Sequence, residues 1–166
     1  MPVNMLGDFS IHTVGGAIGD KITPETIAHH LAHINRFNGA FGAYSVAQHC
    51  VHVSEQLPPL LKFSGLMHDV CEVWTGDIIT PVKKYLGLPA GHLEAHYLTQ
   101  VDARWGAQTR HEFVREADIR MLTTELKSFG APFKEVSRIE PYDFTVRRWN
   151  AEQAKAAWLA LYYALV

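Results

Sequence analysis

The stretch LMHDVCEVWTGD, residues 66–77, most narrows what this chain can fold into. Its apolar residues follow the spacing of a buried helix, yet the same stretch carries four ionisable side chains: His68, Asp69, Glu72 and Asp77. An ionised carboxylate in a helical core is costly unless it has a partner, because burial strips it of water. The stretch therefore predicts a core helix that carries a buried polar centre.

Helical spacing recurs along most of the chain. Thr23 before Pro24 is typical of a helix start, and Ser45 and Thr109 are further candidate N-caps. No strand–helix alternation, repeat or linker interrupts the pattern. We predict an all-α fold of about six to seven helices, one domain over 1–166, with 1–22 an irregular arm or short hairpin. Helices are expected at 23–37, 44–57, 60–74, within 75–87, and at 90–106, 109–129 and 147–166.

Composition excludes several classes of partner. The net charge of −2 over 166 residues does not favour capture of a nucleic acid polymer or an acidic membrane. Apolar runs are too short to cross a bilayer, and the N-terminus lacks the plan of a secretory signal, so we expect a cytosolic protein. Cys50 and Cys71 are then expected to stay reduced. Ten histidines favour metal chemistry.

Two histidines and two aspartates form a candidate metal set: His49, His68, Asp69 and Asp118. They lie on three predicted helices, and a metal ion is a partner that can hold two imidazoles and two carboxylates together. This mixed nitrogen and oxygen set suits a divalent ion such as Co, Mn, Zn, Fe or Ni, with Mg also open.

The same residues resemble the HD-domain metal-dependent phosphohydrolases. The resemblance rests on His49, on the His68–Asp69 pair 19 residues later, and on Asp118 a further 49 residues after Asp69. It extends to YSVAQHC, HDVCEVWTGDIITPVK and READ, and covers roughly residues 13–127. These segments are similar to the small bacterial and phage branch, which includes 5′-deoxynucleotidases and phage dATP triphosphohydrolases.

The resemblance implies a role for each matching residue. The four residues of the candidate metal set would bind the ion, Glu72 would act as general acid or base, and Asp77 would contact the sugar. Arg36 would bind phosphate, and Lys83 and Arg115 are further candidates. Phe37 stands where the family often has Trp and would contact the nucleoside, while Gly39 leaves room nearby.

The function that the resemblance implies is hydrolysis of 2′-deoxynucleotides at the 5′ phosphoester. The products would be deoxynucleoside and phosphate from a monophosphate, or deoxynucleoside and triphosphate from a triphosphate such as dATP. The expected partner is a small deoxynucleotide, and the expected location is a bacterial or phage-infected host cytosol. A regulatory HD domain that binds a nucleotide without turnover is an alternative, and so is a diiron oxygenase with further ligands.

Other features have simpler interpretations. His29 and His33 lie one helical turn apart in HHLAH, but a single helix offers no third ligand, so we expect satisfied or exposed histidines. His52 shares a helix face with His49 and could support it from behind. The apolar stripe of the last helix is either core or a subunit interface, and its width favours a homo-oligomer, dimer or hexamer.

Overall fold

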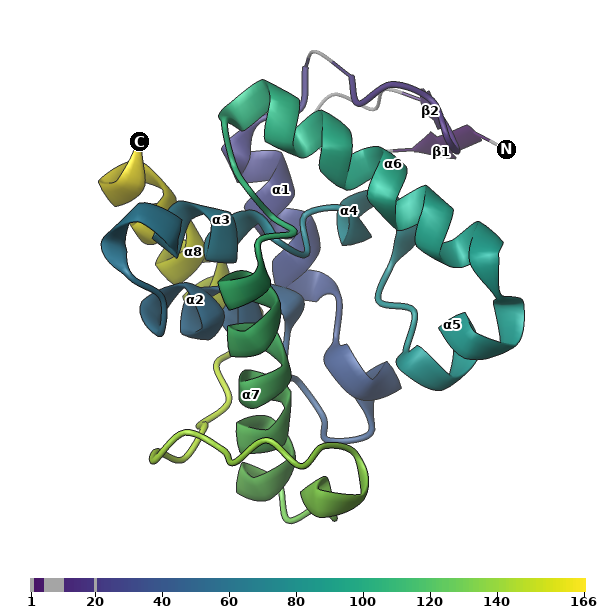
Figure 1. Cartoon of the computed structure of the whole chain (residues 1–166). Helices are drawn as coiled ribbons and strands as arrows, with labels where there is room; N and C mark the ends of the chain where they lie inside the picture. The colour runs from purple at the N-terminus through teal and green to yellow at the C-terminus, as the bar shows by residue number, and fades with distance from the viewer. Residues whose placement is uncertain (1, 5–10, 20) are drawn as a thin grey trace.

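The computed structural model describes residues 2–4, 11–19 and 21–166, and most of these residues are helical (Figure 1). The prediction of an all-α fold is confirmed. The α-helices are α1 Pro24–His33, α2 Val46–Glu55, α3 Lys62–Met67, α4 Glu72–Thr75, α5 Thr80–Leu86, α6 Leu88–Trp105, α7 Glu112–Ser128 and α8 Ala151–Leu165. Short 3-10 turns lie at η1 Arg36–Gly39, η2 Pro59–Leu61 and η3 Phe133–Glu135.

The N-terminal arm contains a small hairpin, as predicted for part of 1–22. Strands β1 Pro2–Asn4 and β2 Ile11–Thr13 pair antiparallel, with Val3 opposite His12. The rest of that prediction, at residues 1, 5–10 and 20, lies outside the described residues. No helix in the described part of the chain combines the length and apolar character that crossing a membrane requires.

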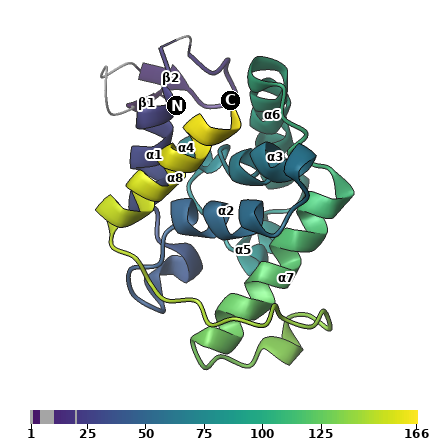
Figure 2. The same cartoon turned by 90° about the vertical axis from the view of Figure 1, so that its left-hand side faces the viewer.

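Helix α2 runs through the middle of the molecule, and Figure 2 shows α8 and α3 on either side of it. Nearly every residue of α2 is buried, including the polar Gln48 and His49. From α8, Trp158 and Tyr162 stack with ring centroids 5.4 Å apart and both are buried. Much of the stripe predicted as core or interface therefore faces the core, whereas Tyr163 is exposed.

A glycine allows α2 and α3 to approach closely. A Cβ atom on Gly65 would lie 2.4 Å from Cδ1 of Leu57 and 3.1 Å from the backbone Cα of Ser54. The backbone of α2 cannot move away without disturbing the core, so only glycine fits this position. His68 follows three residues after this contact, at the end of α3.

The predicted continuous helix over 60–74 is wrong. The chain instead forms η2, α3 and α4, with a turn at 68–71 between α3 and α4. Hydrogen bonds in this turn reach back three residues, from Val70 N to Met67 O and from Glu72 N to Asp69 O. His68 and Asp69 therefore lie in a tight turn between two short helices, and His68 keeps right-handed helical backbone angles.

Three helix ends also differ from the prediction. Helix α1 ends at His33, so Arg36 begins a separate 3-10 turn. Helix α7 is capped by His111, whose Nδ1 accepts from Phe113 N, and not by Thr109, which is buried. Helix α8 starts at Ala151 because Asn150 and Gln153 form a reciprocal capping box. The predicted caps Thr23 and Ser45 are confirmed.

Candidate metal centre

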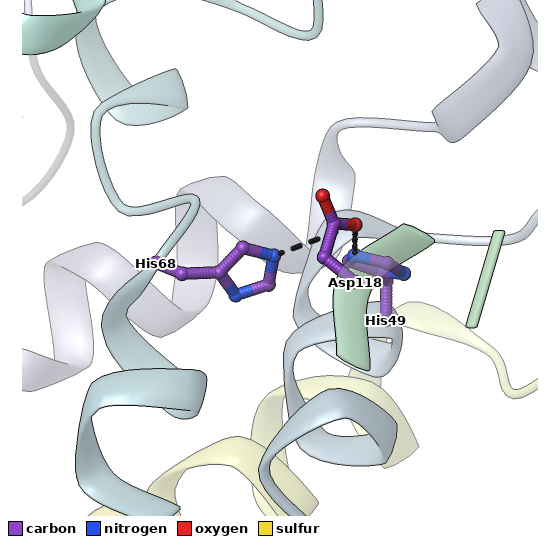
Figure 3. Close-up of side chains that lie close together, drawn as sticks. All are labelled: His49, His68 and Asp118. Carbon is purple, nitrogen blue, oxygen red and sulfur yellow. Dashed lines mark hydrogen bonds and ion pairs between the residues drawn. The ribbon is translucent and has the colours of Figure 1, made fainter. Parts of the chain in front are cut away.

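Three of the predicted ligands meet between α2, the 68–71 turn and α7. Nε2 of His49 lies 3.0 Å from Oδ1 of Asp118, and Nε2 of His68 lies 3.8 Å from the same oxygen. Figure 3 shows the two rings on either side of the carboxylate. Helix α7 contributes Asp118 from its partly buried face, directly after the buried Ala117.

Asp69 completes the set. Its Oδ2 lies 3.3 Å from Nε2 of His68 and 3.7 Å from Nε2 of His49. Donor atoms bound to one ion at roughly 2.0–2.2 Å in a tetrahedral site are about 3.4 Å apart. The four separations between nitrogen and oxygen donors lie around that value, so the buried cluster has the dimensions of a metal site. His49, His68 and Asp118 form a group able to hold a metal ion.

Both imidazoles are held by their other nitrogen. Nδ1 of His68 donates to the carbonyl of Gly65 at 2.7 Å, and Nδ1 of His49 donates to a carboxylate oxygen of Glu125. Each ring therefore presents the lone pair of Nε2 to the carboxylates. In His68 this Nε2 is buried and has no hydrogen-bond partner among the described residues. A proton on the ring or a cation between nitrogen and carboxylate would satisfy these contacts, and the donor set is one that a divalent ion can bind.

The pKa values of His68 and Asp69 are shifted because the two side chains are largely buried next to each other. Burial disfavours the charged imidazole, but the Asp69 carboxylate outweighs it and raises the pKa of His68 well above its usual value. Burial likewise opposes ionisation of Asp69, yet His68 holds the pKa of that carboxyl at about 2. The pocket therefore favours positive charge, which a proton on His68 or a divalent ion can supply.

Glu125 accepts a hydrogen bond from Nδ1 of His49, the ring nitrogen that faces away from the aspartates. This residue was not predicted from the sequence. It is fully buried on α7, where Oε1 also accepts from the hydroxyl of Tyr44 at 2.7 Å. Its Oε2 accepts from Nη2 of Arg36 at 3.1 Å. Burial opposes the charge of Glu125, but Arg36 outweighs it and lowers the pKa of this carboxyl. A signal was available, because position 125 lies two helical turns after Asp118 on the same face.

Arg36 contacts both Glu125 and the candidate ligand Asp69. Its Nη1 lies 3.7 Å from Oδ2 of Asp69, and its side chain is only 11% exposed. The guanidinium is thus fixed between the buried Glu125 and a ligand carboxylate. Arg36, which was predicted as a phosphate-binding residue, therefore lies beside the carboxylate of Asp69. A bound anion would need positive charge at this place.

Glu72 and Asp77 lie on the same side as Asp69. Glu72 is buried at the start of α4, and its Oε2 has no hydrogen-bond partner among the described residues. Burial, with further repulsion from Asp69 and Asp77, raises the pKa of Glu72 well above its usual range. Burial also raises the pKa of Asp77, which is partly exposed in the segment after Gly76. Glu72 is therefore a carboxyl that holds its proton more strongly than an ordinary glutamate.

The remaining predicted residues are less closely grouped. Lys83 on α5 forms an ion pair with Glu94 on α6, with 2.6 Å between Nζ and Oε1. Burial disfavours its charge, but Glu94, with smaller effects of Asp69 and Glu72, outweighs burial and raises the pKa of Lys83. Arg115 is exposed on α7. A Cβ atom added at Gly39 would meet nothing within 4 Å, so the space beside this residue does not depend on its lacking a side chain.

Phe37 and Asn38 follow Arg36 in left-handed backbone conformations, with φ of 58° and 52°. Non-glycine residues in this region are strained by roughly 1–2 kcal/mol each. Phe37 packs edge-on against Phe41, with ring centroids 5.1 Å apart. The strained turn fixes the direction in which Arg36 leaves the chain.

The other histidines lie apart from the centre. Nδ1 of His33 donates to the carbonyl of His29, and neither residue belongs to a metal-sized group within the described residues. His52 packs on the ring of Trp149 and approaches Glu55, so it does not support His49 directly. Cys50 and Cys71 are both buried free thiols.

The aspartates of the cluster are more exposed to solvent than its histidines. His49 and His68 are buried, whereas the side chains of Asp69 and Asp118 are 21% and 37% exposed. The cluster therefore opens to solvent on its carboxylate side. A small ligand would approach a divalent ion held here from that side.

Comparison with known proteins finds relatives, but no family model matches the chain. The chain is 34% identical over 113 residues to the uncharacterized protein YfdR of Escherichia coli K12, covering 67% of this chain and 63% of YfdR. It is 36% identical over 92 residues to an uncharacterized protein of Rhodobacter capsulatus, covering 49% of this chain and 47% of that protein. The chain thus spans less than two thirds of the length of these relatives.

Proposed function

We propose that this protein is a metal-dependent phosphohydrolase that cleaves the 5′ phosphoester of 2′-deoxynucleotides. The observation that carries the proposal is the convergence of His49, His68 and Asp118, with Asp69 beside both rings, next to a buried arginine. The order of these residues in the chain also resembles the HD-domain phosphohydrolases. Both the substrate class and the turnover belong to what is proposed.

The four ligands would hold the ion, and a divalent ion there supplies polarisation of a phosphoryl oxygen and a more acidic water molecule. Arg36 contributes fixed positive charge next to Asp69, where negative charge develops on a phosphoryl group. Because Arg36 is already oriented by Glu125, little reorganisation is needed when an anion binds.

Glu72 moves a proton in this proposal. Burial and the neighbouring carboxylates raise the pKa of Glu72, which suits a group that protonates a leaving oxygen and takes a proton back. In this proposal Asp77, on the segment after α4, accepts a hydrogen bond from a sugar hydroxyl. Phe37 offers an aromatic face near Arg36 for the nucleoside.

Product analysis tests the proposal. Purified protein with Mn²⁺ or Co²⁺ is given dAMP, dGMP, dATP and dGTP separately, and products are separated by chromatography. We expect deoxynucleoside with either phosphate or triphosphate, and loss of product in Asp118→Asn. The matched control Asp143→Asn changes an exposed aspartate and should keep full activity.

Two outcomes would contradict the proposal. If no nucleotide is cleaved with any divalent ion although the ion binds, the phosphohydrolase assignment fails. If a nucleotide then binds without being cleaved, the alternative of a regulatory nucleotide-binding domain takes its place.

A further inference from the structure

A thiol lies against the metal centre from the core side. Cys50 follows His49 on α2 and is fully buried. A sulfur of Cys50, a ring nitrogen of His68 and a carboxylate oxygen of Asp69 all lie within 4.8 Å of one another. This group shares His68 with the group formed by His49, His68 and Asp118.

The second group has the chemistry of a different metal position. Thiolate, imidazole and carboxylate together form a donor set that zinc and similar ions favour, with a metal–sulfur distance of about 2.3 Å. A buried cysteine is more often a small apolar core residue, and Cys71 fits that description. Cys50 differs from Cys71 because it faces two donors, and one of them, His68, has a buried Nε2 without a hydrogen-bond partner among the described residues.

We propose that Cys50, His68 and Asp69 form a thiolate-containing metal position that takes thiophilic divalent ions such as Zn²⁺, Cd²⁺ or Co²⁺. The thiol proton leaves to solvent as the sulfur–metal bond forms, and no electron is transferred. The inference rests on the metal centre of the proposed function, but it does not depend on phosphohydrolase activity.

The two positions exclude each other. Nδ1 of His68 donates to the carbonyl of Gly65, so Nε2 is the only nitrogen of this ring left to bind an ion. One nitrogen lone pair serves one ion. A thiophilic ion bound with Cys50 therefore takes His68 away from the position formed with His49 and Asp118, and it displaces a harder ion such as Mn²⁺.

Co²⁺ spectroscopy on the full chain tests the proposal. Cobalt bound through thiolate gives a near-ultraviolet charge-transfer band, while its visible bands report binding through any donors. We expect both features in the wild type and in Cys71→Ser, which is the matched buried control. In Cys50→Ser and Cys50→Ala the charge-transfer band should vanish and the visible bands should remain. The second variant guards against a fold defect caused by a buried hydroxyl.

A competition experiment adds a second readout. Cd²⁺ is titrated against Mn²⁺, and bound Mn²⁺ is followed by electron paramagnetic resonance. Cys50→Ala should weaken the affinity for Cd²⁺ by at least about tenfold, because loss of even an outer contact to a metal site costs roughly 10–100-fold in affinity. The affinity for Mn²⁺ should be unchanged. Visible bands without a charge-transfer band in the wild type would overturn this inference alone. Absence of any Co²⁺ binding would overturn the metal centre and the inference with it.

Discussion

Nδ1 of His49 donates its proton to a carboxylate oxygen of Glu125, although the two residues are 76 positions apart in the chain. This bond fixes both the tautomer and the direction of the ring, so Nε2 faces Asp69 and Asp118. The same carboxylate accepts from Tyr44 and Arg36. Glu125 thus determines how a ligand and a neighbouring cation are oriented.

Replacing Glu125 with Gln should weaken both stability and metal binding. The change leaves Arg36 as a buried charge without its main partner, which costs about 3 kcal/mol in the free energy of unfolding. It also loosens His49, and the dissociation constant for Mn²⁺ should rise roughly 10–100-fold. Urea unfolding and calorimetric titration measure the two effects.

Glu116→Gln is the control for that experiment, since Glu116 is exposed on the same helix. It should change the free energy of unfolding by less than about 0.5 kcal/mol. Equal effects of the two substitutions would contradict the supporting role of Glu125.

Metal binding should strengthen as pH rises toward the raised folded pKa of His68 and level off above it. The folded pKa of His68 is raised above its usual value of 6.5. In the metal-free protein the charged ring therefore stabilises the fold fully below about pH 6.5, and this contribution is lost as pH rises through the folded pKa. An ion must displace that proton, so the increase in melting temperature caused by Mn²⁺ should grow over the same window.

Scanning calorimetry with and without Mn²⁺ at several pH values measures this effect. At a free concentration about 100 times the dissociation constant, the stabilisation should approach about 2.7 kcal/mol. In Asp118→Asn most of the shift should disappear at every pH. A shift in that variant equal to the wild type would place the ion elsewhere.

Lys83 should contribute to nucleotide affinity, whereas its neighbour Lys84 should not. Lys83 lies near Asp69 and Glu72 and is fixed by Glu94, while Lys84 is exposed. If the proposed function holds, Lys83→Ala should raise KM about tenfold, because it removes a charged contact to phosphate. Steady-state kinetics of Lys83→Ala and Lys84→Ala measure the difference, and equal KM values would remove Lys83 from the site.

Gly65→Ala should destabilise the protein by about 1–3 kcal/mol, because the new methyl group overlaps Leu57 and the backbone at Ser54. Gly91→Ala is the matched control in α6, where no atom lies within 4 Å of the new methyl group. That control should be neutral or stabilise by up to about 1 kcal/mol. Thermal unfolding compares them, and a neutral Gly65→Ala would show that α2 and α3 can separate.

The sequence predicted those parts of the molecule that depend on local pattern. Thr23 and Ser45 cap their helices because a side-chain oxygen before a helix meets free backbone N–H groups whatever the rest of the chain does. The four candidate metal ligands were predicted from their residue types on predicted helices and from a resemblance, and the structure brings their donor atoms close together.

What escaped prediction depends on distant contacts. Residues 60–74 have the apolar spacing of one helix, yet the chain turns at 68–71, three residues after α3 packs closely on α2 at Gly65. Glu125 looks like one of several charged residues on an amphipathic helix until the fold places Arg36, Tyr44 and His49 around it. Cys50 looks like a core residue, and only its proximity to His68 and Asp69 sets it apart.

The donors of the metal centre come from segments separated by 19 and 49 residues. Such loops must close before the donors can meet, and closure costs entropy that local helices do not lose. We therefore expect the centre to assemble late in folding and to open early in unfolding. An ion that binds only the assembled centre would then leave the folding rate nearly unchanged and slow the rate of unfolding, so that metal supply sets the lifetime of the native state.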